Sequence, residues 1–410
     1  MGDFNQSVIV DTIRRSRTGL SRVELVAATG LSPQTISNIC RRLLDSNLIE
    51  EAGKSGSGPG KPRTMLRLNP QGRYALGVHL DPTVITVVML DLTGAVVERS
   101  RIATPPVTDP RLIIDRIASE LTALIVASGV SRERIGGVGI AAPGPIDAGR
   151  GTVVDPPHLA SWHRVPLRDA LQDALGLPAI LDKDVTASAV AEMWAGGESG
   201  IGSFVFLYLG TGIGAGLVIH DEVVRGSSAN AGEVGHIVID PDGPPCWCGL
   251  SGCIAVTCTP QAIVHEAERL GVLGRRPAAV DVDSRGNPAT DDTTTVDARF
   301  TELCRAAEAG DRVATAVIDR SAVRLTKAVA VIANLLDVDR VVFGGPFWGR
   351  VSAHYLRRVP ELLEEARATR SIHRVAITGT AVGEDVAAIG AACLVLDRAL
   401  TPNPKALLLT

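Results

Sequence analysis

Three cysteines and one histidine lie close enough together in the sequence to bind a metal ion. Cys246, Cys248 and Cys253 fall in a glycine-rich segment that can fold round one ion, and His236 lies shortly upstream at the end of an expected strand. Three thiolates and an imidazole form the closed ligand set of structural metal sites. The sequence therefore predicts a Cys3His site. The alternative is a group of free thiols, which would be an oxidation liability in an exposed loop.

A second set of polar residues follows one face of an expected helix that starts at Ser32-Pro33. Serine suits the N-cap, and proline suits the first turn, where its missing N–H costs nothing. Amides and guanidinium groups can bond base edges and phosphates in pairs, so this face could read a major groove. The competing interpretation is a plain helical hairpin with a solvated face. The polar face consists of Gln34, Thr35, Ser37, Asn38, Arg41 and Arg42.

The elements around this helix are typical of a winged helix-turn-helix. One helix is expected over 8–13, and another begins after Ser21, where Ser21 and Glu24 have the spacing of a capping box. A break at 29–31 separates it from the helix that begins at Ser32. A helix, a glycine-containing turn and a second helix form the core of this motif.

A wing is expected to follow. Two short apolar strands, over 48–51 and 64–68, enclose a flexible basic loop. Its residues Lys61 and Arg63 could enter a minor groove, where narrow A·T-rich stretches attract cations. A flexible linker is the competing interpretation of this loop. The DNA-binding domain is expected over residues 1–70, with Ser32, the polar face, Lys61 and Arg63 as its DNA contacts.

The charge distribution agrees with a polyanion partner for this part of the chain. Residues 1–74 carry a formal charge of +5, and the whole chain of 410 residues carries −4, so the remainder is acidic. A basic head on an acidic body indicates double-stranded DNA as the partner of the head alone. Surface charge that arose by chance is the alternative.

Nothing in the sequence indicates export or membrane insertion. The N-terminus lacks a basic region followed by an apolar one, so a cytoplasmic protein with reduced thiols is expected. The segment 199–219 has no charged residue, but its regularly placed glycines indicate two buried strands around a turn. Four further cysteines have no partner nearby and are expected in the core: Cys40, Cys258, Cys304 and Cys393.

Beyond residue 70 the sequence alternates buried strands with helices. Strands are expected in the segments 74–80, 84–94 and 95–99, joined by tight turns, and a helix over 112–127 leads to a further strand at 135–142. A similar strand, turn and strand recur at 204–219. This pattern predicts an α/β body of two similar sheet-and-helix halves with a cleft between them.

Five motifs together resemble the ROK family (repressors, open reading frames and kinases). The family's body has the actin-like, ribonuclease-H-like, two-lobed sugar-kinase fold, and a winged head on this body resembles the repressor branch. The resemblance extends from the head through Gly390. The matching motifs are segments 142–147, 182–187 with Glu192, 209–216, 231–236 and 246–253.

The resemblance also implies a domain organisation and a cofactor. One kinase-like lobe is expected over 71–190 together with 381–410, and the other over 191–380. A structural zinc is implied at His236 and the three cysteines, where it would also orient the neighbouring Glu233.

The first phosphate loop departs from the family's kinases. An active kinase resembles Gly-x-Asp-x-Gly-Gly-Thr, whereas segment 77–83 reads Gly-Val-His-Leu-Asp-Pro-Thr. Asp81 places a negative charge where phosphates would lie, and Pro82 removes a donor N–H. Asp184 matches the family's catalytic base, but a base without a bound triphosphate transfers nothing. We therefore expect no kinase activity, with Asp184 retained as a vestigial base that accepts a hydrogen bond from a ligand.

The implied sugar pocket is altered as well. Lys183 and His158 stand where asparagine is usual, and Ala255 stands where glutamate is usual. Two potential cations are gained and one carboxylate is lost, which favours an effector more anionic than glucose, such as a phosphorylated or acidic sugar. Alternatively, the pocket has decayed and binds no small molecule. The expected effector-binding residues are Gly144, His158, Lys183, Asp184, Glu233 and His236.

These interpretations lead to one principal hypothesis. The chain is expected to be a transcription regulator, of the repressor type, for carbohydrate metabolism. Effector occupancy would change the angle between the lobes and the spacing of two heads in a homodimer or homotetramer. One alternative is an ATP-dependent sugar kinase with a regulatory DNA-binding head. Another is a scaffold that a protein partner regulates while its pocket stays empty.

Overall fold

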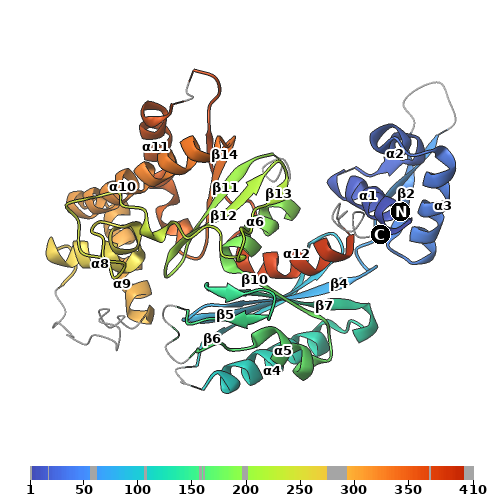
Figure 1. Ribbon diagram of the computed structural model, residues 1–410, viewed down its shortest axis with the longest axis horizontal. Coiled ribbons are helices and arrows are strands. Elements are labelled where there is room, and N and C mark those ends of the chain that lie inside the picture. Colours follow the sequence, from blue (N-terminus) through green and yellow to red (C-terminus); the bar gives the residue numbers. More distant parts are fainter. Residues whose placement is uncertain are drawn as a thin grey trace.

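The computed structural model describes residues 2–16, 18–55, 62–105, 109–156, 159, 162–195, 202–274, 293–368 and 371–400 (Figure 1). The head combines helices with a small antiparallel sheet in the strand order β1-β3-β2. Its elements are α1 (Gly2–Arg15), β1 (Leu20–Ser21), α2 (Arg22–Thr29), α3 (Pro33–Asp45), β2 (Ile49–Ser55) and β3 (Arg63–Leu68).

Local hydrogen bonds explain where the head helices begin and end. The Glu24 N–H donates to Ser21 Oγ at 3.4 Å and the Ser21 N–H donates to Glu24 Oε2 at 2.7 Å, which confirms the predicted capping box before α2. Gly30 ends α2 in the left-handed region, at φ 69°. Ser32 caps α3 by accepting from the Thr35 N–H at 3.2 Å. Both predicted helices are confirmed, and α1 is longer than the sequence pattern indicated.

The first sheet has the strand order β10-β7-β4-β5-β6, in which β4, β5 and β6 are antiparallel neighbours and β7 and β10 run parallel to β4. Helices α4 (Pro110–Ser128) and α5 (Leu167–Leu175) cover its outer face. A small hairpin, β8 (Ile146–Asp147) with β9 (Thr152–Val153), follows β7, and a 3-10 turn η1 (Arg132–Arg134) precedes it. The strands are β4 (Tyr74–Leu80), β5 (Val84–Asp91), β6 (Val96–Ala103), β7 (Ile135–Ala142) and β10 (Ala179–Lys183).

The second sheet repeats this connectivity, with the order β13-β12-β11-β14-β15. Again the first strands form an antiparallel meander, and β14 and β15 continue parallel to β11. The strands are β11 (Phe204–Leu209), β12 (Ile213–Ile219), β13 (Glu222–Val223), β14 (Arg340–Gly344) and β15 (Ala376–Gly379). On its outer side lie η3 (Val234–His236), α7 (Ile254–Thr257), α8 (Pro260–Arg269), α9 (Thr293–Glu308), α10 (Arg312–Leu336) and α11 (Trp348–Ala366).

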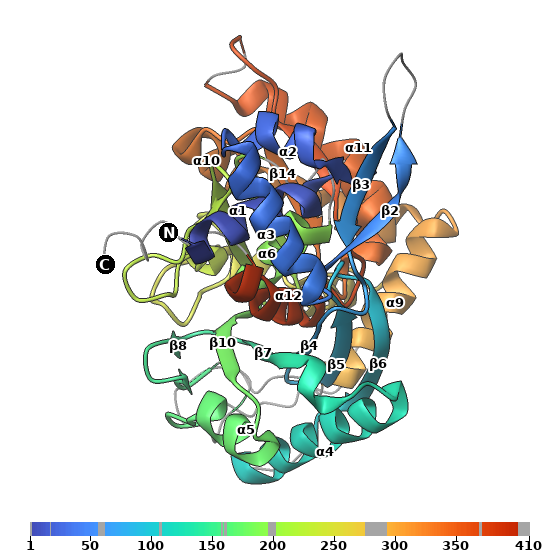
Figure 2. The same ribbon diagram turned by 90° about the vertical axis from the view of Figure 1, so that its right-hand side faces the viewer.

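Two helices, α6 (Asp184–Ala195) and α12 (Val386–Leu400), fill the space between the sheets. Glycines permit this close packing. A Cβ at Gly139 of β7 would lie 1.6 Å from the Ala391 carbonyl oxygen of α12, and one at Gly390 would lie 1.8 Å from the Ala187 carbonyl oxygen of α6. Figure 2 shows the head next to α12, which α1 contacts. The predicted α/β fold with two similar halves is confirmed.

The described part of the charge-free segment, 202–219, forms two strands, as predicted. Side chains of β11 alternate between two cores: Phe204 and Phe206 pack toward α6 and α12, while Val205 and Leu207 pack toward the outer helices.

Among the described residues, no helix combines the length and the apolar character needed to cross a bilayer. The four cysteines expected in the core are buried.

Candidate functional site

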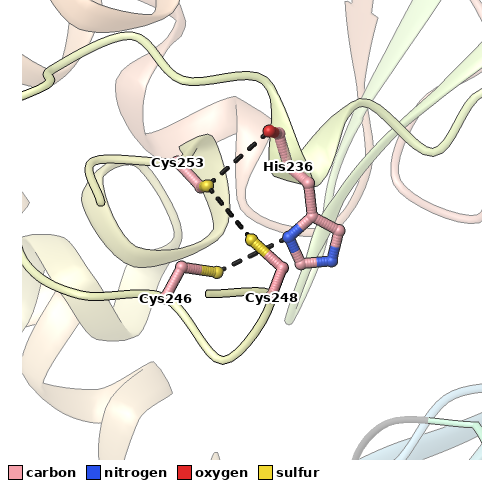
Figure 3. A group of neighbouring side chains, drawn as sticks. All are labelled: His236, Cys246, Cys248 and Cys253. Carbon is pink, nitrogen blue, oxygen red and sulfur yellow. Dashed lines mark hydrogen bonds between the residues drawn. The ribbon is translucent and has the colours of Figure 1, made fainter. Parts of the chain in front are cut away.

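The predicted metal ligands, His236 of η3 and three cysteines of the following loop, come together in the second half (Figure 3). Their ligand atoms all lie within 4.8 Å of one another. Cys246 Sγ lies 3.5 Å from His236 Nδ1, and Cys248 Sγ lies 3.7 Å from Cys253 Sγ. A tetrahedral zinc with Zn–S bonds of about 2.3 Å and Zn–N bonds of about 2.0 Å requires edges of about 3.8 Å between sulfurs and about 3.5 Å from sulfur to nitrogen. The residues therefore fit such an ion.

The loop backbone holds these ligands in place. The Cys246 N–H donates to the Leu250 carbonyl at 2.7 Å, and the Gly249 N–H donates to the Cys246 carbonyl at 3.0 Å. Gly252 lies so close to Asp240 that a Cβ would approach the Asp240 carbonyl oxygen to 1.5 Å. The chain therefore needs glycine at position 252 to close the loop.

Asp184 begins α6 at the end of β10, where the two halves of the body meet. Its Oδ1 accepts a hydrogen bond from the Val185 N–H at 2.7 Å. Burial raises the pKa of the Asp184 carboxyl, and the nearby His79, the Val185 N–H and Lys183 oppose that shift only in part. A carboxyl with a raised pKa beside two basic groups can accept a hydrogen bond from a ligand hydroxyl, or donate one to it when protonated.

Lys183, Glu233 and Gly144 lie together at the same place. The Lys183 ammonium forms an ion pair with Glu233 and donates to the Ala231 carbonyl at 3.3 Å. A Cβ at Gly144 would lie 2.8 Å from Lys183 Cε and 3.1 Å from Glu233 Oε1. The charge of Lys183 is thus compensated by the Glu233 carboxylate. The sequence analysis counted Lys183 as a gained cation and did not predict this ion pair.

The remaining expected effector residues are His236 and His158. His236 directs its Nδ1 at Cys246 as part of the cysteine cluster (Figure 3). His158 lies outside the described residues. A role for either residue in binding an effector remains a prediction.

The structure adds two buried residues near Asp184 that the sequence analysis missed, His79 and Tyr208. His79 is buried, its ring centroid lies 6.1 Å from that of Tyr208, and its Nε2 has no hydrogen-bond partner among the described residues. The alternation of side chains between the two faces of β4 could have revealed His79. Leu76 and Val78 contribute to the core under α4 and α5, so a histidine one residue further on must point to the opposite side of β4, toward α12.

The segment that the sequence analysis compared with a phosphate loop forms a closed turn at Asp81. Asp81 Oδ1 accepts from the Thr83 N–H at 2.8 Å and from the Thr83 hydroxyl at 2.5 Å. Burial, and then the charges of Asp81, Asp184 and Asp385, raise the pKa of the Tyr208 hydroxyl well above its usual range. The carboxylates of Asp81, Asp184 and Asp385 therefore all lie near the Tyr208 hydroxyl.

The polar face of α3 is exposed, as predicted. Asn38 Oδ1 accepts from Arg41 Nη2 at 2.7 Å and from Gln34 Nε2 at 3.3 Å, which links side chains from successive turns. Ser32 Oγ lies 2.8 Å from Thr35 Oγ1. The exposed members of the predicted set are Ser32, Gln34, Ser37, Asn38, Arg41, Arg42 and Arg63, Thr35 is partly exposed, and Lys61 lies outside the described residues.

Comparison with known proteins identifies the family. The chain is 29% identical to a putative xylose repressor of Caldicellulosiruptor sp. (strain Rt8B.4), over 87% of each chain, and 29% identical to a glucokinase of Halalkalibacterium halodurans, over 79% of this chain and 95% of that one. A crystal structure of a ROK family transcriptional regulator, a homologue of the E. coli Mlc protein, has a TM-score of 0.77 at 23% identity and covers 97% of each chain. Residues 75–398 match the ROK family. The chain therefore belongs to the ROK family.

Proposed function

We propose that this protein is a sequence-specific DNA-binding transcription regulator, of the repressor type, for carbohydrate metabolism. The observation that carries the proposal is an exposed polar row on α3, formed by Gln34, Asn38 and Arg41. Hydrogen bonds link these side chains along the helix. Their remaining amide and guanidinium N–H groups can bond base edges in a major groove. We interpret the head as a winged helix-turn-helix, with α3 as recognition helix and β2 and β3 as the sides of the wing.

The head has the geometry that this role needs. The apolar face of α3 is buried through Ile36, Ile39 and Leu43, so the opposite face is the one left for a partner. Arg42 and Arg63 add exposed cations that can contact phosphates. Relatives named as repressors support the proposal.

A DNA-retardation experiment tests this assignment. Full-length protein is mixed with fragments of its own genome at low and moderate salt, and the bound fragments are sequenced. The combined variant Gln34→Ala, Asn38→Ala, Arg41→Ala should weaken binding by about 100-fold or more, since three base-edge contacts of about 1–3 kcal/mol each contribute at least about 3 kcal/mol. Arg150→Ala, which removes a cation with 78% of its side chain exposed on the body, is the matched control and should bind normally. Unchanged retardation by the triple variant, or no binding in dilute buffer, overturns the proposal.

We assign the effector site to Gly144, Lys183, Asp184 and Glu233, with His236 and His158 as further candidates. The effector would be a sugar or sugar derivative, as the names xylose repressor and glucokinase among the relatives support. These residues come from both halves of the body, so a bound ligand can favour one interlobe angle over another. In a homodimer or homotetramer, that angle would set the spacing between two heads.

Kinase activity is not part of the proposed function. The closed turn from Asp81 to Thr83, which holds the buried Asp81 carboxylate in place, disfavours a nucleotide's phosphates. The alternative, an ATP-dependent sugar kinase with a regulatory head, is supported by the glucokinases among the relatives. A coupled assay of ADP release over a panel of sugars separates the two, and turnover at ordinary enzyme rates would make the kinase the primary function.

We further assign a structural zinc to His236, Cys246, Cys248 and Cys253. A closed set of four ligands leaves no position for a substrate, so the ion would stabilise the loop that carries Glu233 and His236.

A DNA partner and reduced thiols are both expected in the cytoplasm, which we propose as the site of action.

A further inference from the structure

Lys183 carries a buried ammonium group at the junction of the two halves. Its side chain is 3% exposed, and it is the last residue of β10 in the first sheet. Both of its acceptors, Glu233 and the Ala231 carbonyl, belong to the segment that precedes η3 in the second half. An ammonium has three N–H donors, so one donor has no acceptor among the described residues. A cation in this position requires an anion beside it.

The anion that compensates Lys183 can leave, because the Glu233 side chain is 61% exposed. The backbone near Glu233 is fixed by other contacts. Asn230 Oδ1 accepts from the Ile146 N–H at 2.8 Å, Asn230 Nδ2 donates to the Ile146 carbonyl at 2.8 Å, and the Ala215 N–H donates to the Gly232 carbonyl at 2.9 Å. Rotation of the Glu233 side chain into water therefore need not disturb the segment that bears it.

The residues around Lys183 suit a ligand that brings its own anionic group to the ammonium in place of the Glu233 carboxylate. Gly144 has no side chain, so its backbone lies directly against Lys183 and Glu233. Asp184, the next residue, is a half-buried carboxyl that can bond a hydroxyl beside the ammonium. A ligand with an anionic group next to hydroxyls would match Lys183 and Asp184 together.

We propose that Lys183 selects an anionic monosaccharide derivative, whose carboxylate or phosphate replaces the Glu233 carboxylate at the Lys183 ammonium. This inference rests on the proposed effector site. One ion pair is broken and one is formed, so the buried cation is never left uncompensated. Glu233 turns toward water, where its carboxylate is already largely solvated. A neutral sugar cannot make this exchange and would have to bind beside the intact pair.

Calorimetric titration of the full-length protein tests the proposal with matched ligands. The panel comprises glucose, mannose and galactose, the uronic acid of each, and the 6-phosphate of each. Acetate and inorganic phosphate are added as free anions. At least one uronic acid or sugar phosphate should bind about tenfold or more tightly than its neutral parent. The uronic and phosphate arms distinguish a carboxylate from a phosphate as the group recognised.

Two variants should change the binding of the anionic sugar in opposite directions. Lys183→Met keeps the length of the side chain and should reduce the preference for the anionic sugar to about twofold or less. Glu233→Gln removes the competing carboxylate and should tighten anionic binding by about threefold or more, whereas a glutamate that merely bonds a sugar hydroxyl would weaken it. Glu361→Gln, an exposed glutamate on α11, is the control, and thermal unfolding of each variant verifies that it folds.

Each remaining outcome counts against the inference. Equal binding of a neutral sugar and its anionic form, anionic preference that persists in Lys183→Met, or weaker binding by Glu233→Gln would overturn it, as would a panel in which no ligand binds. None of these titrations contains DNA. Loss of DNA binding in the retardation experiment would instead refute the proposed regulator, so the two failures can be told apart.

Discussion

The Arg14 guanidinium lies 4.4 Å from the ring centroid of Trp194, and this contact joins the first helix of the head to the last turn of α6. Arg14 is held in position by Asp11, whose Oδ1 accepts from its Nη2 at 2.7 Å. The Trp194 indole N–H donates to Asp397 of α12 at 3.2 Å. Because α6 begins at Asp184, a single helix extends from the candidate effector site to the base of the head.

Replacing Arg14 with methionine should loosen the head. Both partners are largely buried, with 9% of the Arg14 side chain and 8% of Trp194 exposed, and a desolvated cation–π contact contributes about 2 kcal/mol. Amide hydrogen exchange in α1 should become faster, while exchange in β4 and β7 stays unchanged. Arg15→Met is the control, because its side chain is 40% exposed, and ion pairs such as those it forms with Asp11 at 2.9 Å and Asp221 at 3.9 Å contribute little at such an exposed position. Equal protection of α1 in wild type and Arg14→Met would refute a stabilising contact.

Removing one metal ligand should destabilise the second half of the body. Cys248→Ser keeps the size of an exposed side chain but loses a thiolate, so bound zinc should fall from one equivalent toward none. The free energy of unfolding should fall by about 3 kcal/mol, the value for an ion at about 100 times its dissociation constant. Elemental analysis and thermal unfolding, with and without a chelator, measure both quantities. Leu250→Ser in the same exposed loop leaves the ligands intact and should retain the metal. Full metal content in Cys248→Ser would contradict the assigned ligand set.

Local signals in the sequence were sufficient for some parts of this structure. The capping box at Ser21 and Glu24 and the short spacing of Cys246 and Cys248 involve residues a few positions apart, so chain geometry alone brings them together. The repeated strand pattern also predicted the two similar halves, because each strand carries its own signal of burial. These features depend little on the rest of the fold.

Contacts between distant segments could not be predicted in the same way. Lys183 and Glu233 are 50 positions apart, and only the packing of the two halves makes them an ion pair. The docking of Arg14 on Trp194 depends on the same kind of long-range packing. Lys183 therefore looked like a free cation in the sequence, whereas its charge is compensated in the fold. The DNA contacts on α3 remain predictions until binding is measured.

The cap of α2 offers a test of head stability. Ser21→Ala removes the hydroxyl that accepts from the Glu24 N–H and should lower the free energy of unfolding of the head by about 1 kcal/mol. Chemical denaturation followed by circular dichroism measures this loss. Ser131→Ala is a matched control, since Ser131 precedes η1 without a side-chain capping bond and should have almost no effect. A loss as large in Ser131→Ala would mean that the cap of α2 has no special contribution.

A charged network ties α8 and α10 to the segment that leads into the cysteine loop. Arg324 Nη1 donates to Glu266 at 2.6 Å, Arg324 Nε donates to Asp240 at 3.1 Å, and Arg320 Nε donates to Glu266 at 2.6 Å. Burial alone would raise the pKa of the Glu266 carboxyl, but the hydrogen bonds and charges of Arg324 and Arg320 outweigh it, and the pKa lies below its usual range. The ionised form of Glu266 therefore stabilises the fold.

Glu266→Gln should lower the free energy of unfolding at neutral pH by about 2 kcal/mol, because it leaves two arginines short of a partner. A carboxyl whose pKa is lower in the folded state than its unfolded value of about 4.3 stabilises the protein above that value and loses this effect as the pH falls through the folded-state pKa. The difference between wild type and Glu266→Gln should therefore shrink below about pH 4. Denaturant unfolding across this range measures it, with Glu361→Gln, 67% exposed, as the control that should show almost no difference at any pH. A difference that stays constant as the pH falls would show that Glu266 acts through its shape and not through its charge.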